Sequence, residues 1–263
     1  MHSVTFSFDD GGVPAVVMLV VGVALFILKV YFTSKKQRKK QEEGRSGTAK
    51  NMLDVIGRYF PLYEQPCGEY QEMKFSGMKF HTRRFYASGF GPVAMMSGSL
   101  CFGLMKAEIL IINPTERDMP LLSYNRVCGA ENDRMIFELY DTMVVRPDLS
   151  PLSAVKRYAS SLPDYDLGCR WCDAIRLPQS LAKQGNNVQE SSFDSISNHY
   201  LTQYIEIAAT AHSCEAVTKR KKTSACVEGM LRSDSYSTNL IRQNIGEEKT
   251  AQLFRKILFA TEE

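Results

Sequence analysis

The sequence predicts an α+β fold, in which helices cover an antiparallel sheet, preceded by one N-terminal transmembrane helix. Three observations lead to this prediction. Residues 11–28 form an apolar run without a charged side chain. Residues 73–145 contain short runs rich in β-branched and aromatic residues, and apolar residues recur at helical spacing after position 151. Strands that precede the helices, rather than alternating with them, are typical of the α+β class.

The transmembrane helix is predicted at residues 13–33. Residues 30–33 continue the apolar run beyond Lys29, to about 20 residues in all, which suffices for one bilayer crossing. Acidic residues precede this run, at Asp9 and Asp10, and a basic cluster follows it at 35–40. The positive-inside rule therefore predicts a single-pass protein whose C-terminal domain is cytosolic. Which membrane is meant stays open.

A cleaved signal peptide is the alternative to an anchor. It requires lysine or arginine before the apolar run and a small-x-small cleavage site after it, and the sequence has neither. The basic cluster also resembles a nuclear signal, but beside a membrane span it is better suited to anionic lipid. We expect a short non-cytosolic tail (1–12), the helix (13–33), a basic linker (34–50) and a folded domain (51–263).

Charge and cysteine usage exclude two classes of protein. The net charge is +3, and without the five basic residues of the 35–40 cluster it is −2, so the domain lacks the basic excess typical of nucleic-acid binding. Seven scattered cysteines, an odd number, argue against a secreted disulfide scaffold. Cys169 and Cys172 form a C-R-W-C pair without a second ligand pair at zinc spacing, which favours reduced thiols over a metal or redox role.

Four segments are predicted to form the sheet. Each combines β-branched and aromatic residues with turn residues at its ends, as in an antiparallel meander. They cover residues 73–86, 97–113, 121–128 and 134–145. Asn113 and Pro114 end the second segment, and residues 129–133 form a hairpin loop between the last two.

Helices are predicted in the rest of the chain, from residue 151 onward. A short one covers 151–161, and a long one presents an apolar face from Phe193 to Ala208. Ser237 and Thr238 are expected to cap a third helix that Gly246 closes, and a last helix begins at 247. The basic run 219–222 is predicted as a solvated loop, with docking of an acidic partner protein or of lipid headgroups as the alternative.

Three ordered segments resemble the ferredoxin-dependent bilin reductases, which reduce open-chain tetrapyrroles. The first is an apolar strand, a proline turn and a second strand (109–125); the second is the tryptophan-led WCDAIRLPQSLAKQG (171–185). The third is the C-terminal loop, helix, glycine and acidic pair, and final helix ending in Ile-Leu-Phe (237–259). The similarity covers residues 70–260 in order and spacing.

This resemblance implies an α/β/α sandwich with a central antiparallel sheet. It also implies reduction of a biliverdin-type bilin with electrons from an external reduced ferredoxin, and no bound metal or flavin. A bilin is flat, conjugated and doubly anionic. Its pocket needs apolar faces, a few basic groups, and an acid whose pKa burial has raised. The implied partners are a linear tetrapyrrole, a ferredoxin-type donor and membrane lipid, and not nucleic acid.

The resemblance also suggests catalytic residues, with departures. The strand carboxylate of the family falls on Asn125, whose amide does not donate a transferable proton at neutral pH. Some members use an acid of the C-terminal loop instead, and Asp234 lies in that loop here. The family's strand histidine has no counterpart, and Glu108 nearby is the candidate substitute, although a shift of one residue in register would turn it to the other face.

Four further residues are candidates for substrate binding: His81, Arg84, Tyr236 and Ser237. His81, beside Arg83 and Arg84, is placed to hydrogen-bond a propionate, and an ordinary surface position is the alternative. Tyr236 falls where the acid of the family's loop stands. Two other functions stay open at this point. One is a non-catalytic tetrapyrrole-binding or scaffold protein that has lost the acids, and the other is a membrane adaptor without a deep pocket.

Overall fold

A computed structural model describes residues 51–262, apart from 76–77, 101–104, 130–131, 169, 187–188 and 234. The predicted membrane span at 13–33 lies outside these residues. Within the described part of the chain, no helix is both long and apolar enough to cross a bilayer.

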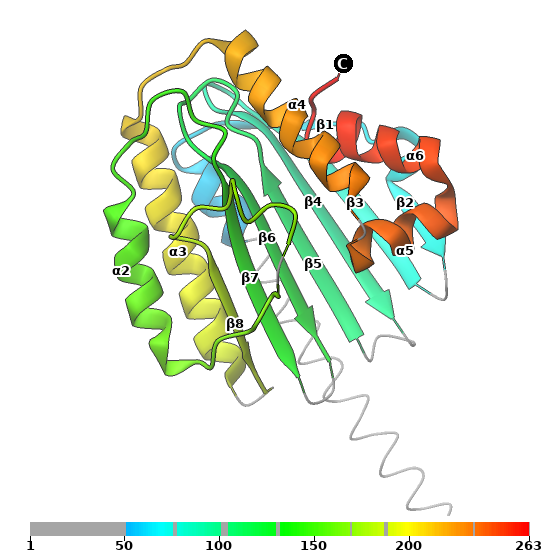
Figure 1. The fold of residues 1–263 in the computed structure, drawn as a ribbon, viewed down its shortest axis with the longest axis horizontal. Coiled ribbons are helices and arrows are strands. Elements are labelled where there is room, and N and C mark those ends of the chain that lie inside the picture. The colour runs from blue at the N-terminus through cyan, green and yellow to red at the C-terminus, as the bar shows by residue number, and fades with distance from the viewer. Residues whose placement is uncertain are drawn as a thin grey trace, which may run out of the picture. The chain divides into compact units, whose positions relative to one another are not determined.

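One antiparallel sheet of eight strands forms the centre of the domain (Figure 1). Its order is β1-β3-β4-β5-β6-β7-β8, and β2 pairs with β3 beside β1. The strands are β1 (Leu62–Gln65), β2 (Glu72–Phe75), β3 (Met78–Ala87), β4 (Gly91–Leu100), β5 (Met105–Ile112), β6 (Leu121–Cys128), β7 (Asp133–Tyr140) and β8 (Leu181–Gly185). All sequential pairs from β3 to β7 are neighbours, so the predicted meander is confirmed.

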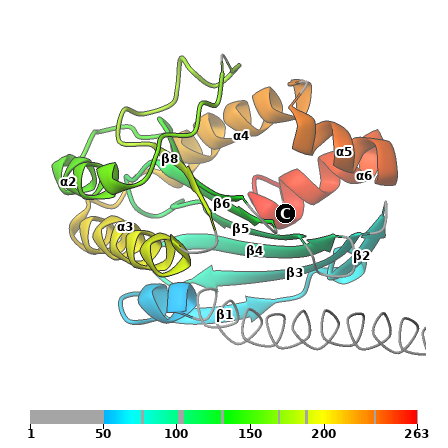
Figure 2. The same cartoon turned by 90° about the horizontal axis from the view of Figure 1, so that it is seen from below.

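Helices cover both faces of the sheet (Figure 2). One face carries α3 (Glu190–Thr210), with α2 (Ser150–Tyr158) packed against it, and a short helix at 51–57. The other face carries α4 (Ala216–Arg232), α5 (Tyr236–Ile245), α6 (Glu247–Gln252) and a π-helical turn at Leu253–Leu258. The described residues thus form the three-layer α/β/α sandwich that the resemblance implied.

Strand alternation divides the sheet into two faces, which we call the α3 face and the C-terminal face. On β5, Leu110 and Ile112 belong to the core under α3, whereas Ile109 and Ile111 pack under the C-terminal helices. Successive side chains of a strand point to opposite sides, so one register shift exchanges the two sets. Every assignment of a strand residue to the site depends on this alternation.

The long helix α3 has the apolar face that its spacing predicted. Phe193, Ile196 and Leu201 are fully buried against the sheet. Two tyrosines on the same face keep their hydroxyl groups bonded: Tyr200 donates to the Gln179 carbonyl at 2.9 Å and Tyr204 to the Pro120 carbonyl at 2.7 Å. Buried hydroxyls without such partners would cost about 1–3 kcal/mol each.

The basic run 219–222 is not a solvated loop, which corrects that prediction. It lies in α4, where Lys219 is completely buried. Its Nζ donates to the Met119 carbonyl and, at 3.1 Å, to the Thr142 hydroxyl. Lys222 donates to the Met143 carbonyl. The two lysine side chains fasten α4 to the segment before β6 and to the loop after β7. Their ammonium groups are hydrogen-bonded, although a run of four basic residues is typical of an exposed sequence.

Burial lowers the pKa of Lys219 to about 8, from a usual value of 10.5. Below about pH 8 the ammonium is charged in both the folded and unfolded chain. Between pH 8 and 10.5 only the unfolded chain holds the proton, so the free energy of unfolding rises with pH, by about 3 kcal/mol in total. We expect Lys219→Met to lose this rise in urea denaturation at pH 7.5–10.5. Lys221→Met, on the exposed side of α4, is the matched control; equal pH slopes in the two variants would contradict the assignment.

The outer edge of β8 is covered by the segment before it. Tyr165 donates its backbone N–H to the Ala182 carbonyl at 3.1 Å, and Gln184 donates to the Pro163 carbonyl at 3.0 Å. Two backbone groups on the outer side of this last strand, the Ala182 carbonyl and the Gln184 N–H, are therefore bonded.

Candidate functional site

A groove lies between the C-terminal face of the sheet and the helices above it. Its free volume is about 110 Å³. The sheet contributes Met96, Ile109, Ile111, Ser123, Asn125, Glu138 and Tyr140. The covering layer contributes Arg170, Trp171, Met230, Ser233, Ser235, Thr238, Ile241, Phe254, Leu258 and Phe259. The groove thus has apolar side chains on both sides. Its charged groups lie at the β7 edge, and three hydroxyl side chains (Ser233, Ser235 and Thr238) lie where α4 ends and α5 begins.

Asn125 lies in this groove, as expected, but its strand neighbours are apolar. It pairs with Ile109 on β5 and Ile136 on β7. Its amide nitrogen donates to the Ser123 hydroxyl at 3.2 Å. The position therefore offers a hydrogen-bonding amide on an apolar floor, without an acid beside it in the same row.

Glu138 is the acid of the groove, and the sequence reasoning missed it. It stands on β7 opposite Ser123, with only 4% of its side chain exposed. Arg170 donates to Oε1 at 2.6 Å, and the Tyr140 hydroxyl donates to Oε2 at 2.9 Å. The bond between the guanidinium and the carboxylate is a short, charge-assisted hydrogen bond. Burial, followed by the charge of Glu138, raises the pKa of Tyr140 well above its usual value, so the phenol keeps its proton.

A second guanidinium completes this cluster. Arg176 Nη1 lies 4.0 Å from the same Glu138 oxygen, and its Nη2 lies 2.9 Å from Asp173 Oδ1. Asp173 also accepts the backbone N–H of Arg170 at 2.8 Å. Two arginines and two carboxylates therefore balance one another at the edge of the groove, and bind the segment 170–176 to β7.

Trp171, the one tryptophan of the sequence, closes the groove at this edge. Its ring stacks on Tyr140, with the centroids 6.4 Å apart and the planes at 19°. Its other neighbour is Gly229 of α4, where a Cβ would lie 2.3 Å from a ring carbon of the indole. Only glycine permits this contact.

We expect Gly229→Ala to displace the Trp171 indole and to lower the free energy of unfolding by about 1–2 kcal/mol through overpacking. The helix propensity of alanine alone would act in the opposite direction, by up to about 1 kcal/mol. Gly57→Ala is the control, because its nearest neighbour would be Leu62 Cδ1 at 3.8 Å, an ordinary contact. Tryptophan emission and urea denaturation measure both effects. An unshifted emission maximum in Gly229→Ala would contradict the contact.

Two predicted site residues lie on the wrong face. Glu108 pairs with Arg126 and Ser97, and shares the α3 face with them. His81 pairs with Ser97 in the same row, with 42% of its side chain exposed and its Nδ1 4.0 Å from Glu72. The expectation that Glu108 enters the groove with Asn125 is therefore corrected, and His81 lies at the surface position that was its alternative. The cause is strand alternation, since Glu108 is one residue away from Ile109, which does face the groove.

Of the other predicted residues, Arg84 belongs to β3, and Tyr236 and Ser237 belong to α5. Arg84 shares the C-terminal face and the row of Ser123 and Glu138. It does not line the groove, and its buried Nε has no hydrogen-bond partner among the described residues. Tyr236 and Ser237 begin α5, and Asp234 lies outside the described residues. The predicted cap at Ser237 is wrong by two positions, because Ser235 accepts the Thr238 N–H at 3.3 Å.

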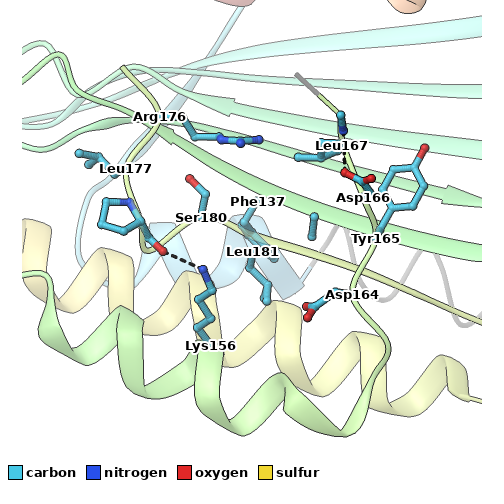
Figure 3. Close-up of a pocket in the computed structure, with 13 residues that line it drawn as sticks. Phe137, Lys156, Asp164, Tyr165, Asp166, Leu167, Arg176, Leu177, Ser180 and Leu181 are labelled. Atoms are coloured by element: carbon cyan, nitrogen blue, oxygen red, sulfur yellow. Dashed lines mark hydrogen bonds between the residues drawn. The ribbon is translucent and has the colours of Figure 1, made fainter. Parts of the chain in front are cut away.

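A larger cavity, of about 340 Å³, lies between α2 and the β8 edge (Figure 3). Phe137 and Leu181 form its floor, and its polar groups are engaged with one another or with the backbone. Lys156 Nζ donates to the Pro178 carbonyl at 2.8 Å. Asp164 Oδ1 lies 2.7 Å from Lys183 Nζ, and Asp166 accepts the Gly168 backbone N–H at 2.8 Å. We take the smaller groove as the candidate site because it holds Asn125 and the buried acid. Arg176 lies between the groove and the larger cavity: it lines the larger cavity, and its Nη1 lies 4.0 Å from Oε1 of Glu138 in the groove.

The described residues contain no group of three or more histidine, cysteine or acidic side chains that could hold a metal ion. Of the C-R-W-C pair, Cys172 is buried and burial raises the pKa of its thiol, whereas Cys169 lies outside the described residues. The buried thiol is therefore protonated, which disfavours a role as nucleophile or ligand.

Comparisons with known proteins agree with this architecture. No protein-family model matches the chain, and no curated protein matches it in sequence. Its structure is similar to the crystal structure of phytochromobilin synthase from tomato in complex with biliverdin, with a TM-score of 0.66, 14% sequence identity and 80% of each chain covered. That protein is a ferredoxin-dependent bilin reductase. The remote resemblance seen in the sequence is thus confirmed at the level of the fold.

Proposed function

We propose that this chain is a bilin-reductase-like oxidoreductase that binds a biliverdin-type open-chain tetrapyrrole in the groove over Asn125. One observation carries the proposal. On a fold similar to that of a biliverdin-bound reductase, the space between the sheet and the C-terminal helices has apolar faces and one charged edge. This combination suits a flat conjugated ligand with anionic substituents.

The groove residues suggest how such a ligand would lie. Met96 and Ile109 on the sheet, and Phe254 and Leu258 on the π-helical turn, offer apolar surfaces to the two faces of the conjugated system. Arg170 offers a guanidinium to a carboxylate at the charged edge.

The volume of the groove places a condition on binding. Pockets for ligands of this size usually measure about 300–1,000 Å³, whereas the groove measures about 110 Å³. A tetrapyrrole therefore enters only if part of the covering layer moves outward. The covering layer includes Trp171, which closes the charged edge of the groove, and this is the part that we expect to move.

Reduction of one double bond requires two electrons and two protons. We propose that the electrons come from an external donor of the ferredoxin type. Asn125 orients the ligand, because its amide donates a hydrogen bond but not a proton at neutral pH. Asp234, two residues before the start of α5, stays our candidate proton donor, and Tyr236 and Ser237 stay candidates for ligand binding.

A second function, binding without catalysis, is favoured by a specific observation. The row of Asn125 contains Ile109 and Ile136 rather than a titratable group, and Glu138 is engaged by Arg170 and Tyr140. A chain that kept the groove and lost the proton donor would hold the pigment as a carrier or scaffold.

One experiment separates the two functions. The full chain, purified in detergent, is mixed with biliverdin, and a reduced ferredoxin system is then added. Binding should quench the emission of Trp171, the one tryptophan. A subsequent shift of the bilin absorbance supports the reductase, and quenching without that shift supports the carrier. If biliverdin changes neither signal, both proposals are rejected.

We also propose that residues 13–33 anchor the chain and that the domain faces the cytosol. The uncharged run and the basic cluster after it support this orientation. After expression in cells, the full chain should stay with membranes during alkaline carbonate extraction, and a chain that begins at residue 45 should not. Release of both chains would reject the anchor.

A further inference from the structure

We infer that Glu138 is a positioning residue that holds Arg170 and Trp171 across the groove, and that an anionic ligand opens the groove by taking Arg170 from Glu138. The inference deepens the proposed function and rests on it for the identity of the ligand. The contact between Glu138 and the two groove residues stands on geometry alone.

The Glu138 carboxylate holds the closing segment at two points. Oε1 accepts Arg170 at 2.6 Å, directly before Trp171 in the chain. Oε2 accepts the Tyr140 hydroxyl at 2.9 Å, and the Tyr140 ring is the surface on which Trp171 stacks. One side chain therefore fixes both the residue that precedes the indole and the ring beneath it.

Arg170 is the arginine of this cluster that a ligand in the groove can reach, because Arg176, although equally exposed, does not line the groove. Its side chain is 26% exposed, whereas that of Glu138 is 4% exposed, and both line the groove. A guanidinium has five N–H donors, so a ligand carboxylate can begin to bind Arg170 before the bond to Glu138 breaks. The exchange replaces one charge-assisted bond with another, so little energy is lost while the groove opens.

Arg176 makes this exchange feasible for the acid that is left behind. A buried carboxylate without a cation is strongly unfavourable. Arg176 Nη1 already lies 4.0 Å from Glu138 Oε1, just beyond hydrogen-bond distance, and needs to approach by only about 1 Å to replace Arg170. Glu138 thus keeps a partner in both states, and Arg170 and Trp171 are free to move with the ligand.

The size of the groove requires such a movement. With Trp171 between Tyr140 and Gly229, the free volume is about 110 Å³. Trp171 is half-buried, so it is held by its neighbours without being enclosed by the core. Withdrawal of this one large side chain opens the charged edge of the groove directly over Glu138 and Tyr140.

The test measures acrylamide quenching of Trp171 in the full chain, without pigment. The variants are Glu138→Gln, Arg170→Met and the double variant. A lost hydrogen bond to a charged group corresponds to roughly a tenfold change in the equilibrium between the held and released positions of Trp171. We expect the acrylamide quenching constant to rise about threefold in each single variant. The double variant should equal the single ones, because both substitutions remove the same contact. Glu138→Asp should recover most of the wild-type value.

Glu228→Gln is the matched control. It removes another glutamate that is bound to an arginine, with Glu228 Oε1 2.7 Å from Arg255 Nε. Quenching should stay at the wild-type value in this variant. All measurements are made well below the melting temperature of each variant. Unchanged quenching in Arg170→Met, or additive effects in the double variant, would overturn the inference even if Glu138→Gln proves unstable.

A second measurement compares biliverdin with its dimethyl ester. In Glu138→Gln, Arg170 no longer has a carboxylate partner, so biliverdin should bind about tenfold more tightly than to the wild type. The ester, which lacks the carboxylates, should gain less than twofold. Equal gains for the two pigments would overturn the exchange of partners. If neither pigment binds to any variant, the proposed function fails, whereas the quenching result still decides the role of Glu138.

Discussion

Gly91→Ala is expected to lower the free energy of unfolding by about 4 kcal/mol, a large effect for one added methyl group. Gly91 begins β4 with φ at +137°, a conformation that L-residues rarely adopt. A Cβ would lie 2.4 Å from the Asn113 carbonyl oxygen and 2.7 Å from the Thr115 nitrogen. Both are backbone atoms that cannot rotate away, so the strand itself must move.

Gly89→Ala isolates the contribution of the contact. Gly89 has φ at +76°, but a Cβ there meets no heavy atom within 4 Å. Its substitution should cost only the conformational strain, about 1–2 kcal/mol. Urea denaturation of both variants compares them directly. Similar losses in the two would show that β4 can move away from the Asn113–Thr115 loop at little cost.

Arg126→Met is expected to cost about 3–5 kcal/mol. The guanidinium is 2% exposed, donates to Asp133 at 3.2 Å and to Asp194, and lies over the Phe193 ring at 5.4 Å. Methionine retains much of the apolar length but leaves Asp133 buried without its cation. The removal of one partner from a buried pair is costly because the other charge cannot reach water.

Arg83→Met is the corresponding exposed case. Arg83 binds both oxygens of Glu64, at 2.8 and 2.9 Å, but the two side chains are 44% and 54% exposed. Its loss should cost about 0.2–1 kcal/mol. Thermal and urea denaturation at low and high salt check the contrast. A similar cost for the two substitutions would mean that water reaches the Arg126 cluster.

The strands were predictable because local chemistry and tertiary structure agree in them. The predicted run 121–128 coincides with β6, and 134–145 covers all of β7 except its first residue, Asp133. The run 73–86 is divided into β2 and β3, and 97–113 into the end of β4 and β5, since a period-2 pattern does not show where one strand ends and the next begins. Gly246, with φ at +85°, ends α5 where the sequence indicated.

Helix α4 was missed because its burial contradicts its composition. A helix with Lys219 at the centre of its buried side has no clean apolar stripe, and only the distant Met119 carbonyl and Thr142 hydroxyl make that position possible. Such partners, far apart in the chain, cannot be inferred from helical periodicity.

The site was predicted in part, for a related reason. Asn125 was placed by segment order, which survives small errors, whereas Glu108 depended on a register that one residue reverses. The sequence around Glu138 does indicate a buried acid. Glu138 lies between Phe137 and Leu139 in a strand apolar on both faces, and an acid at such a position requires a cation. Arg170 and Arg176 supply it from a segment more than thirty residues away.

The covered edge of β8 has a consequence for concentrated solutions. Open strand edges allow sheets of separate molecules to join, which leads to aggregation. The bonds from Tyr165 to Ala182 and from Gln184 to Pro163 occupy the groups that such joining would use. Shortening the 163–165 segment should therefore expose the outer edge of β8 and allow the domain to self-associate through this strand.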